Sequence, residues 1–370
     1  MSAQPLILAG DAEQRGRAHA AANLKRRDSV HAATIAHVEK ARADGLINER
    51  AKSYLAAQRA FHEVNDPHSL AEIRGIAAGF DLSEDDLFTA FHLGMLRAGF
   101  TMPPEADGCS SWASADGPDG PLVAKNRDTS GTLYGLQHVA LHSGPDIATG
   151  HMLCVGSIGA PACYSSGINS FGFALADTHI PLQRYTVGWH RFFLMGRLMA
   201  ECRSVADALA MIRKARHAGG GSLTMADPTG ATATVEFAET GPSITEGSTG
   251  MPPVYHTNTL KTSPESRATV VSEAVGGTSN ARYAFLERTL PTRTWDIASA
   301  KTLMATHPDG GAPLCQHMDR EGSHTLSTAI YACAAGTLDF SPDNPCRGTW
   351  NRYLVPSPDS LQRHRLRVTL

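Results

Sequence analysis

The feature that most constrains the fold is a change in sequence pattern near residue 105. Before it, Ala51, Leu55, Gln58 and Phe61 follow one another at three- and four-residue steps, which places them on one face of a helix. Pro103-Pro104 ends this pattern, because proline lacks the amide donor that a helix interior needs. Beyond it, short apolar or alternating runs are separated by Gly, Pro and Asp, as is typical of β-strands. The sequence therefore predicts a helical segment followed by a mainly β region.

Turn signals and periodicity predict the elements of that β region. The turn residues 116–120, Asp-Gly-Pro-Asp-Gly, favour a hairpin of residues 109–115 and 121–127. This alternation of strands and helices suits stacked sheets covered by helices. A last hairpin is predicted for residues 324–332 and 337–340, and helices for residues 84–97, 188–202, 204–217 and 280–290.

Composition argues against several classes of protein. A net charge of −3 provides no basic field to recruit nucleic acid. No run of 18 apolar residues is present to span a membrane, and the apolar run near the N-terminus is too short for a secretory signal. The seven cysteines contain no Cys-x-x-Cys pair, which favours reduced thiols. We therefore expect a cytoplasmic protein with no nucleic-acid or membrane partner.

The 17 histidines raise the question of a metal site. His138 and His142 would share one face of a strand, and Cys315-Gln316-His317 places two soft ligands close together. Neither pair has a partner pair at the spacing of known zinc sites, so we interpret them as polar strand and loop residues.

The segment with the clearest chemical potential starts at Gly108-Cys109. The predicted hairpin would bring Lys125 and Asp128 back beside the Cys109 thiol. An ammonium group near a thiol lowers the thiol pKa, and the thiolate is the reactive form. The alternative is a buried cysteine next to an ion pair at a strand end.

Gly-Cys at the head of a hairpin, followed by Lys125-Asn126-Arg127-Asp128, resembles the cysteine branch of the N-terminal-nucleophile (Ntn) hydrolases. More narrowly, the chain resembles the peptidase C45 family of acyl-coenzyme A:6-aminopenicillanic acid acyltransferase-like proteins, with choloylglycine hydrolases as more distant relatives. Further segments similar to that family occur in the same order over about residues 15–355. They are Ala71–Gly79, Gly167–Ala174, His256–Asn258, Ser279–Tyr283 and Thr325–Thr328.

The resemblance implies an α+β fold, a four-layer αββα Ntn-hydrolase sandwich of two antiparallel sheets with a helical N-terminal segment. It also implies self-cleavage between Gly108 and Cys109, so that residues 1–108 and 109–370 become two subunits of one domain. Gly108 would allow the strained backbone that an N-to-S acyl shift needs. The α-amine that is released on Cys109 has an ordinary pKa near 8, which suits a general base.

The resemblance further assigns roles to side chains. Asn169 and Asn258 would donate to the oxyanion that forms when sulfur attacks an amide carbonyl, with Asn258 the better candidate. An alternative for Asn169 is a turn residue that closes its own backbone hydrogen bonds. Arg282 would hold Asp128 or the surroundings of the nucleophile. Lys125 replaces the arginine common in the bile-salt branch and lacks its planar fork.

The expected reaction is hydrolysis of a small-molecule amide through an acyl-enzyme on Cys109, and it requires no metal or organic cofactor. One alternative is acyl transfer from a thioester such as acyl-CoA to an amine. Another is a non-catalytic thiol protein that retains the fold. The sequence leaves homo-oligomer formation open.

Overall fold

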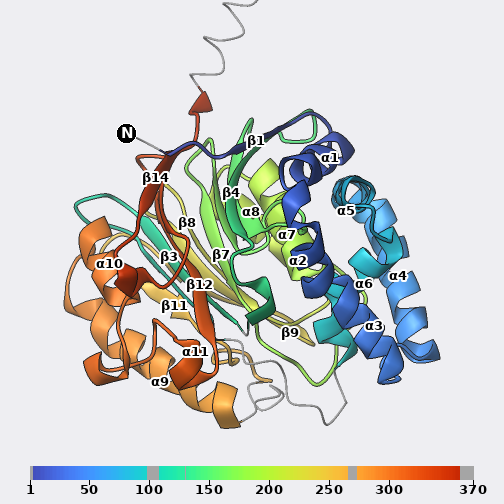
Figure 1. Cartoon of the computed structure of the whole chain (residues 1–370). Coiled ribbons are helices and arrows are strands. Elements are labelled where there is room, and N and C mark those ends of the chain that lie inside the picture. Colours follow the sequence, from blue (N-terminus) through green and yellow to red (C-terminus); the bar gives the residue numbers. More distant parts are fainter. Residues whose placement is uncertain (1–2, 98–107, 130, 266–272, 359–370) are drawn as a thin grey trace, which may run out of the picture.

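Two β-sheets packed face to face form the centre of the molecule, which the computed structural model describes over residues 3–97, 108–129, 131–265 and 273–358 (Figure 1). In spatial order, sheet A consists of β1 (Leu6–Ala9), β4 (Gln137–Ser143), β5 (Met152–Ser157), β6 (Ser166–Asn169), β7 (Ala174–Thr178), β8 (Ser222–Ala226), β9 (Thr232–Ala238) and β10 (Gly241–Gly247). Sheet B consists of β11 (Val254–His256), β2 (Ser110–Ser114), β3 (Leu122–Thr129), β12 (His324–Ala332), β13 (Thr337–Ser341) and β14 (Asn351–Leu354).

Side-chain alternation along the strands separates two apolar layers. On β2 and β3, Ala113 and Val123 face sheet A and share the inter-sheet core with Leu153 of β5. Trp112 and Leu122, one position away, face outward and belong to a different cluster. Sheet B is therefore buried on both faces where these strands run.

Helices cover the outer face of each sheet. The pair α7 (Arg191–Glu201) and α8 (Val205–Lys214) packs on sheet A, while α9 (Glu273–Thr289) and α10 (Ile297–Met304) pack on sheet B. The order helix, sheet, sheet, helix is the predicted αββα sandwich. The short α11 (Met318–Glu321) precedes β12.

The N-terminal segment folds into six α-helices in its described part. They lie beside sheet A and share a core with Ile158 and with Phe193 of α7 (Figure 1). Gly16 and Gly75 lie where two of these helices cross, and a Cβ on Gly75 would stand 2.1 Å from the Glu13 carbonyl oxygen. The helices are α1 (Ala12–Ala22), α2 (Arg27–Ala33), α3 (Ile35–Ala43), α4 (Glu49–Asn65), α5 (Pro67–Phe80) and α6 (Glu84–Leu96).

The segment also supplies β1, which the expectation of a purely helical segment missed. β1 pairs parallel with β4 through Leu6 and Ala140, whereas the other described strand pairs are antiparallel. The prediction of two antiparallel sheets therefore needs one correction, at the edge of sheet A.

The other elements predicted from local patterns are confirmed. The turn at 116–120 joins β2 to β3, and the last predicted hairpin is β12 with β13. The four predicted helices correspond to α6, α7, α8 and part of α9. None of the described helices combines the length and apolar character that crossing a bilayer requires. A cytoplasmic location stays a prediction.

Candidate active site

The alternation of β3 sends its polar side chains to opposite faces of sheet B. Lys125 points toward sheet A, where its ammonium donates to the Asp177 carbonyl and lies 3.5 Å from the Asp177 carboxylate. Asn126 points outward and donates to the carbonyls of Met304 and Leu314 at 2.8 and 2.7 Å. The strand β3 thus places one polar side chain between the two sheets and the next against the outer helical layer.

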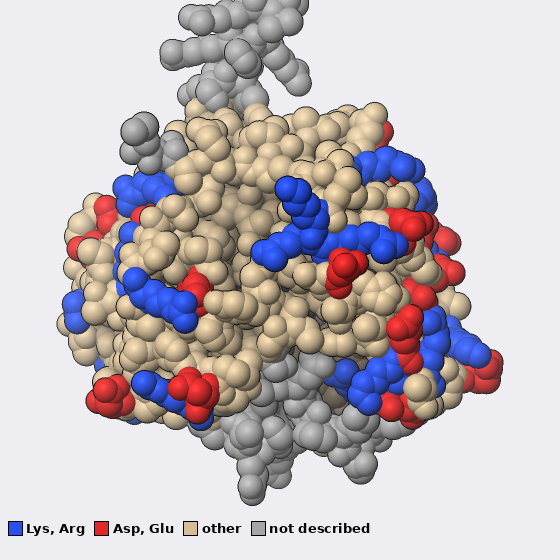
Figure 2. All heavy atoms as spheres, viewed as in Figure 1, with Lys and Arg blue, Asp and Glu red and all other residues tan. Residues whose placement is uncertain are grey.

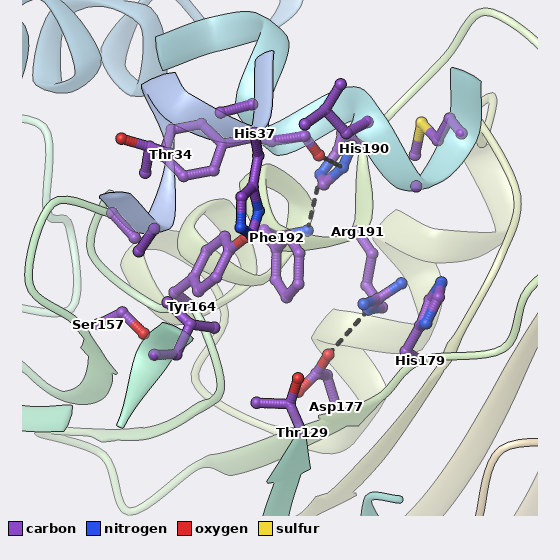
Figure 3. Close-up of a pocket in the computed structure, with 18 of the residues that line it drawn as sticks. Thr34, His37, Thr129, Ser157, Tyr164, Asp177, His179, His190, Arg191 and Phe192 are labelled. Carbon is purple, nitrogen blue, oxygen red and sulfur yellow. Dashed lines mark hydrogen bonds and ion pairs between the residues drawn. The ribbon is translucent and has the colours of Figure 1, made fainter. Parts of the chain in front are cut away.

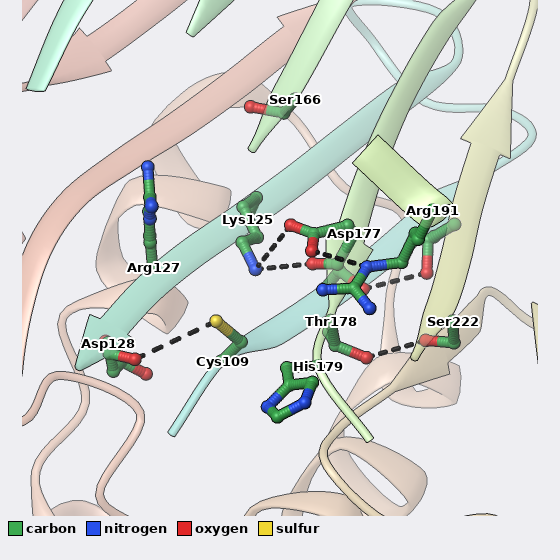
Figure 4. Close-up of polar contacts among 12 residues, drawn as sticks. Cys109, Lys125, Arg127, Asp128, Ser166, Asp177, Thr178, His179, Arg191 and Ser222 are labelled. Carbon is green, nitrogen blue, oxygen red and sulfur yellow. Dashed lines mark hydrogen bonds and ion pairs between the residues drawn. The ribbon is translucent and has the colours of Figure 1, made fainter. Parts of the chain in front are cut away.

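Cys109 stands directly before β2, beside β3, and its side chain is buried (Figure 4). Its Sγ lies 3.9 Å from the main-chain oxygen of Asp128. Burial alone would lower the pKa of Lys125, but the charges of Cys109 and Asp177 outweigh it and raise that pKa, with a smaller contribution from Asp128. Lys125 therefore stays an ammonium group beside the sulfur, which favours the thiolate.

Gly108, which precedes Cys109, is hydrogen-bonded through both its N–H and its carbonyl. Its N–H donates to the Asp128 carbonyl at 3.2 Å, and its own carbonyl accepts from Gln316 Nε2 at 3.1 Å. A Cβ at this position would stand 2.2 Å from Gln316 Nε2, so a larger residue would collide with that amide. Close approach to Gln316 therefore favours glycine at this position, and the expected role of Gly108 in a strained backbone stays a prediction.

The Asp128 carboxylate faces the outer side of sheet B. It accepts from Thr325 Oγ1 at 2.6 Å and from Gln316 Nε2 at 3.4 Å. Thr325 and Gln316 are also joined through their main chains, with Thr325 N–H donating to the Gln316 carbonyl at 3.0 Å. Asp128 is therefore anchored to β12 and to the loop that carries Gln316.

Arg282 of α9 joins Cys109 to Asn258. Its Nη1 donates to the Cys109 carbonyl at 2.6 Å and its Nη2 to Asn258 Oδ1 at 2.8 Å. A guanidinium group can only donate, so the Asn258 oxygen must face it and the Asn258 amide nitrogen must face the other way. That nitrogen donates to the His179 carbonyl at 2.8 Å. Arg282 is fully buried and fixes this orientation.

Asn169 is not brought to this network. Its Nδ2 donates to the carbonyls of Met199 and Cys202 at 3.0 and 2.8 Å, at the end of α7. Its Oδ1 accepts from the Phe171 N–H at 3.0 Å. Both amide hydrogens are used in capping a helix, so Asn169 has no donor for an oxyanion, and its assignment to the catalytic set is corrected. The alternative of a residue closing backbone hydrogen bonds is the better description.

The sequence analysis did not identify Asp177 and His179, at the end of β7, as site residues. Asp177 lies between two cations, since Arg191 Nε donates to its carboxylate at 3.0 Å on the side away from Lys125 (Figure 4). His179 follows two residues later and borders the same pocket as Cys109. A run of Asp-Thr-His at the end of an apolar strand was the available signal, but nothing local connects it to Cys109.

A pocket of about 250 Å³ opens beside Cys109 (Figure 3). Its wall combines apolar side chains of the N-terminal helices, such as Phe91 and Met95, with Tyr164 and Phe192 from the β region. Polar groups converge on it as well: Figure 3 shows His37, His179, His190, Arg191 and Asp177 around the cavity. On the molecular surface shown in Figure 2, acidic and basic side chains are interspersed.

The family model described as acyl-coenzyme A:6-aminopenicillanic acid acyl-transferase matches residues 115–347. The matched range begins after Cys109 and contains Lys125, Asp128, Asn258 and Arg282. No curated protein sequence matches the chain.

Solved structures similar to the chain include a conjugated bile acid hydrolase from Clostridium perfringens, in two variant forms, and a penicillin V acylase from Agrobacterium tumefaciens. Each hydrolase form is 11% identical to this chain, and the match covers 66% of this chain and 92% of the hydrolase chain. The TM-scores are 0.43 and 0.45. The acylase is 12% identical to this chain, and the match covers 68% of this chain and 96% of the acylase chain, with a TM-score of 0.37.

Proposed function

Because the chain belongs to the acyl-coenzyme A:6-aminopenicillanic acid acyl-transferase family, we propose that it is an enzyme that cleaves itself between Gly108 and Cys109. The mature protein then hydrolyses a small-molecule amide through an acyl-enzyme on Cys109. The observation that carries the proposal is the arrangement around this peptide: a thiol beside a buried ammonium group, and a carbonyl held by the amide of Gln316.

Self-cleavage begins when Cys109 Sγ attacks the carbonyl carbon of Gly108. The new S–C bond replaces the C–N bond, the nitrogen takes the thiol proton, and the Gly108 acyl group becomes a thioester. Water then hydrolyses the thioester, which leaves a carboxylate on Gly108 and a free amine and thiol on Cys109. Gln316 Nε2 donates to the oxygen on which negative charge develops, 3.1 Å away in the uncut chain.

The mature site needs a base and an oxyanion donor. The α-amine of Cys109 has an ordinary pKa near 8 and can take the thiol proton when sulfur attacks a substrate carbonyl. Asn258 Nδ2 carries two hydrogens and uses one for the His179 carbonyl, so the other can serve the substrate oxyanion. Arg282 keeps this nitrogen on the productive side. The protonated leaving amine departs, and water then releases the acyl group.

The pocket indicates which part of the substrate it binds. Phe91, Met95, Tyr164 and Phe192 provide an apolar wall for the acyl chain or ring, and the volume of about 250 Å³ suits a small molecule. Arg127 is buried at this pocket, with its guanidinium 5.2 Å from the centre of the Tyr164 ring. It could bind a polar group on the acyl portion.

Acyl transfer from a thioester to an amine is the second candidate, and the description of the family favours it. Both reactions share the acyl-enzyme on Cys109 and differ only in whether water or an amine attacks it. The outcome depends on how well the occupied pocket excludes water.

Intact-mass analysis of purified protein tests self-cleavage. We expect fragments of residues 1–108 and 109–370 from the wild type, and only full-length chain from Cys109→Ala. Cys333→Ala is the matched control, because Cys333 is also buried but lies outside the site. A wild-type chain that stays intact on prolonged incubation would reject self-cleavage and favour the non-catalytic thiol protein.

A substrate screen tests the chemistry. The mature enzyme is incubated with a panel of amides, and separately with acyl-CoA thioesters and amines, and products are followed by mass. Amide hydrolysis that is lost in Cys109→Ala supports the main proposal, and a new amide formed from acyl-CoA supports the second. Brief iodoacetamide treatment should label the mature Cys109 before the five other buried cysteines, and the exposed Cys346 is left out of this comparison. Labelling of another buried cysteine first would contradict the activated thiol.

A further inference from the structure

Four metal-binding side chains meet on the outer side of sheet B, apart from the pocket. They are His307, Cys315 and His317, which lie on the loops between α10 and α11, and Cys346 of a short 3₁₀ turn, Pro345–Arg347. Their ligand atoms all lie within 4.8 Å of one another. The short spacing of Cys315 and His317 was visible in the sequence, but the two partners come from other turns of the chain.

Hydrogen bonding alone does not explain this convergence. His317 Nε2 lies 3.2 Å from His307 Nε2, 3.7 Å from Cys315 Sγ and 3.5 Å from Cys346 Sγ. A ring nitrogen carries either one hydrogen or one lone pair, so it cannot serve three neighbours well. A shared ligand at the centre of the four atoms would satisfy all of them together.

The three separations measured from His317 Nε2 are close to those of a tetrahedral zinc site, and all four ligand atoms lie within 4.8 Å of one another. Zinc lies about 2.3 Å from thiolate sulfur and about 2.0–2.1 Å from imidazole nitrogen, so ligand atoms around it stand roughly 3.3–3.8 Å apart. The three observed distances, 3.2, 3.5 and 3.7 Å, follow this pattern. Two thiolates also neutralise the charge of one Zn²⁺ ion. We propose that His307, Cys315, His317 and Cys346 bind a structural zinc ion.

The position of this site gives the ion a role. Gln316 lies between two of the ligands, and its side chain holds the Gly108 carbonyl. Asn344 Nδ2 donates to the Gln316 carbonyl at 2.7 Å and lies 3.5 Å from Cys315 Sγ, which ties the same loop to the turn carrying Cys346. Zinc would lock the two loops together and keep Gln316 aimed at the peptide before Cys109. The ion itself stays outside the reaction.

Metal analysis tests the proposal independently of activity. The full chain is prepared as Cys109→Ala, so that self-cleavage cannot affect the result, and its metal content is measured after dialysis. We expect about one zinc per chain. Replacement by Co²⁺ should give the intense visible absorption of tetrahedral cobalt and a near-ultraviolet thiolate-to-cobalt band.

Ligand variants sharpen the test. Cys346 is exposed, so Cys346→Ser should fold normally yet weaken zinc binding by more than roughly 100-fold, beyond what an outer-shell contact is worth. The same is expected for His307→Gln. His324→Gln is the matched control, because the His324 ring packs near His317 but its Nε2 contacts Asp343 at 2.9 Å. It should retain the metal.

Three results would overturn the zinc site. They are a folded full chain without zinc that also gives no tetrahedral cobalt spectrum, an unchanged cobalt spectrum in Cys346→Ser, and a Cys315–Cys346 disulfide in freshly prepared protein. All three results are read from chains that carry Cys109→Ala, whereas self-cleavage is read from the wild type, so the two proposals can fail separately.

Discussion

At the scale of single residues, Asn258 and Asn169 differ in how their side-chain amides are hydrogen-bonded. Arg282 holds the oxygen of Asn258, whose nitrogen donates one hydrogen to the His179 carbonyl and, in the proposed mechanism, the other to the substrate. Both amide hydrogens of Asn169, in contrast, cap α7. This difference allows a paired test of the oxyanion donor.

We predict that Asn258→Ala lowers kcat by about 100- to 1000-fold with a smaller effect on KM, because the lost donor acts mainly on the transition state. Asn169→Ala should leave kcat nearly unchanged but reduce the free energy of unfolding by about 1–3 kcal/mol, since two buried carbonyls lose their donor. Steady-state kinetics on cleaved, folded protein and urea unfolding measure the two effects. A near-normal kcat in Asn258→Ala would remove it from the oxyanion site.

In the proposed mechanism, Gln316 acts during self-cleavage, before the chain is cut. Gln316→Ala removes the donor to the Gly108 carbonyl, so self-cleavage should slow by at least about tenfold. The fraction of cut chain is followed by gel electrophoresis after rapid purification, with zinc content measured in parallel. Wild-type cleavage rates in a variant that still binds zinc would show that Gln316 only fills space.

At the scale of elements, α4 contributes an imidazole to an aromatic cluster. The His62 ring is fully buried, 4.7 Å from the Phe193 ring and 5.7 Å from the Trp189 ring by their centres. Neither of its nitrogens has a hydrogen-bond partner among the described residues. Burial, together with the nearby His92, lowers its pKa to about 3. The neutral form is therefore the one that packs.

This packing predicts a pH-dependent stability. The unfolded chain binds a proton at His62 below its ordinary pKa of 6.5, whereas the folded chain resists protonation down to about 3. The contribution of His62 is fully present above pH 6.5 and is lost as pH falls toward 3. His62→Phe should raise stability and reduce its pH slope in this window by about 1.4 kcal/mol per pH unit.

Urea unfolding of wild type and His62→Phe at several pH values between 4 and 7.5 measures the slope. His31→Phe, a partly exposed position on α2, controls for the added ring. Equal slopes in wild type and His62→Phe would mean that the folded protein protonates this ring readily.

At the scale of the whole molecule, the N-terminal segment contributes to both the sheet and the pocket. β1 is a strand of sheet A, and Phe91 and Met95 of α6 line the pocket. The two fragments should therefore stay associated after cleavage and elute together at the volume of the uncut Cys109→Ala chain. Separation should require denaturant. Fragments that separate in native gel filtration would contradict this shared architecture.

Local sequence signals were sufficient for the β2–β3 hairpin and for the other elements predicted from turns and periodicity, although they missed β1. The turn at 116–120 sets the β2–β3 hairpin, and the register of that hairpin brings Lys125 and Asp128 next to Cys109. Period-2 alternation then decides that Lys125 and Asn126 face opposite sides of sheet B. These contacts span few residues, so composition and spacing in a short window determine them.

The remaining contacts depended on how distant segments pack. Gln316 reaches Gly108 across 208 positions, and Arg282 reaches Cys109 across 173. Nothing near Asn169 in the sequence shows that the end of α7 will take both of its amide hydrogens. Cys346 joins His317 only because two loops meet outside sheet B. The sequence by itself determined which groups could react; the packing of sheets and helices decided which meet, because hydrogen-bond and ligand geometry are set by three-dimensional distance.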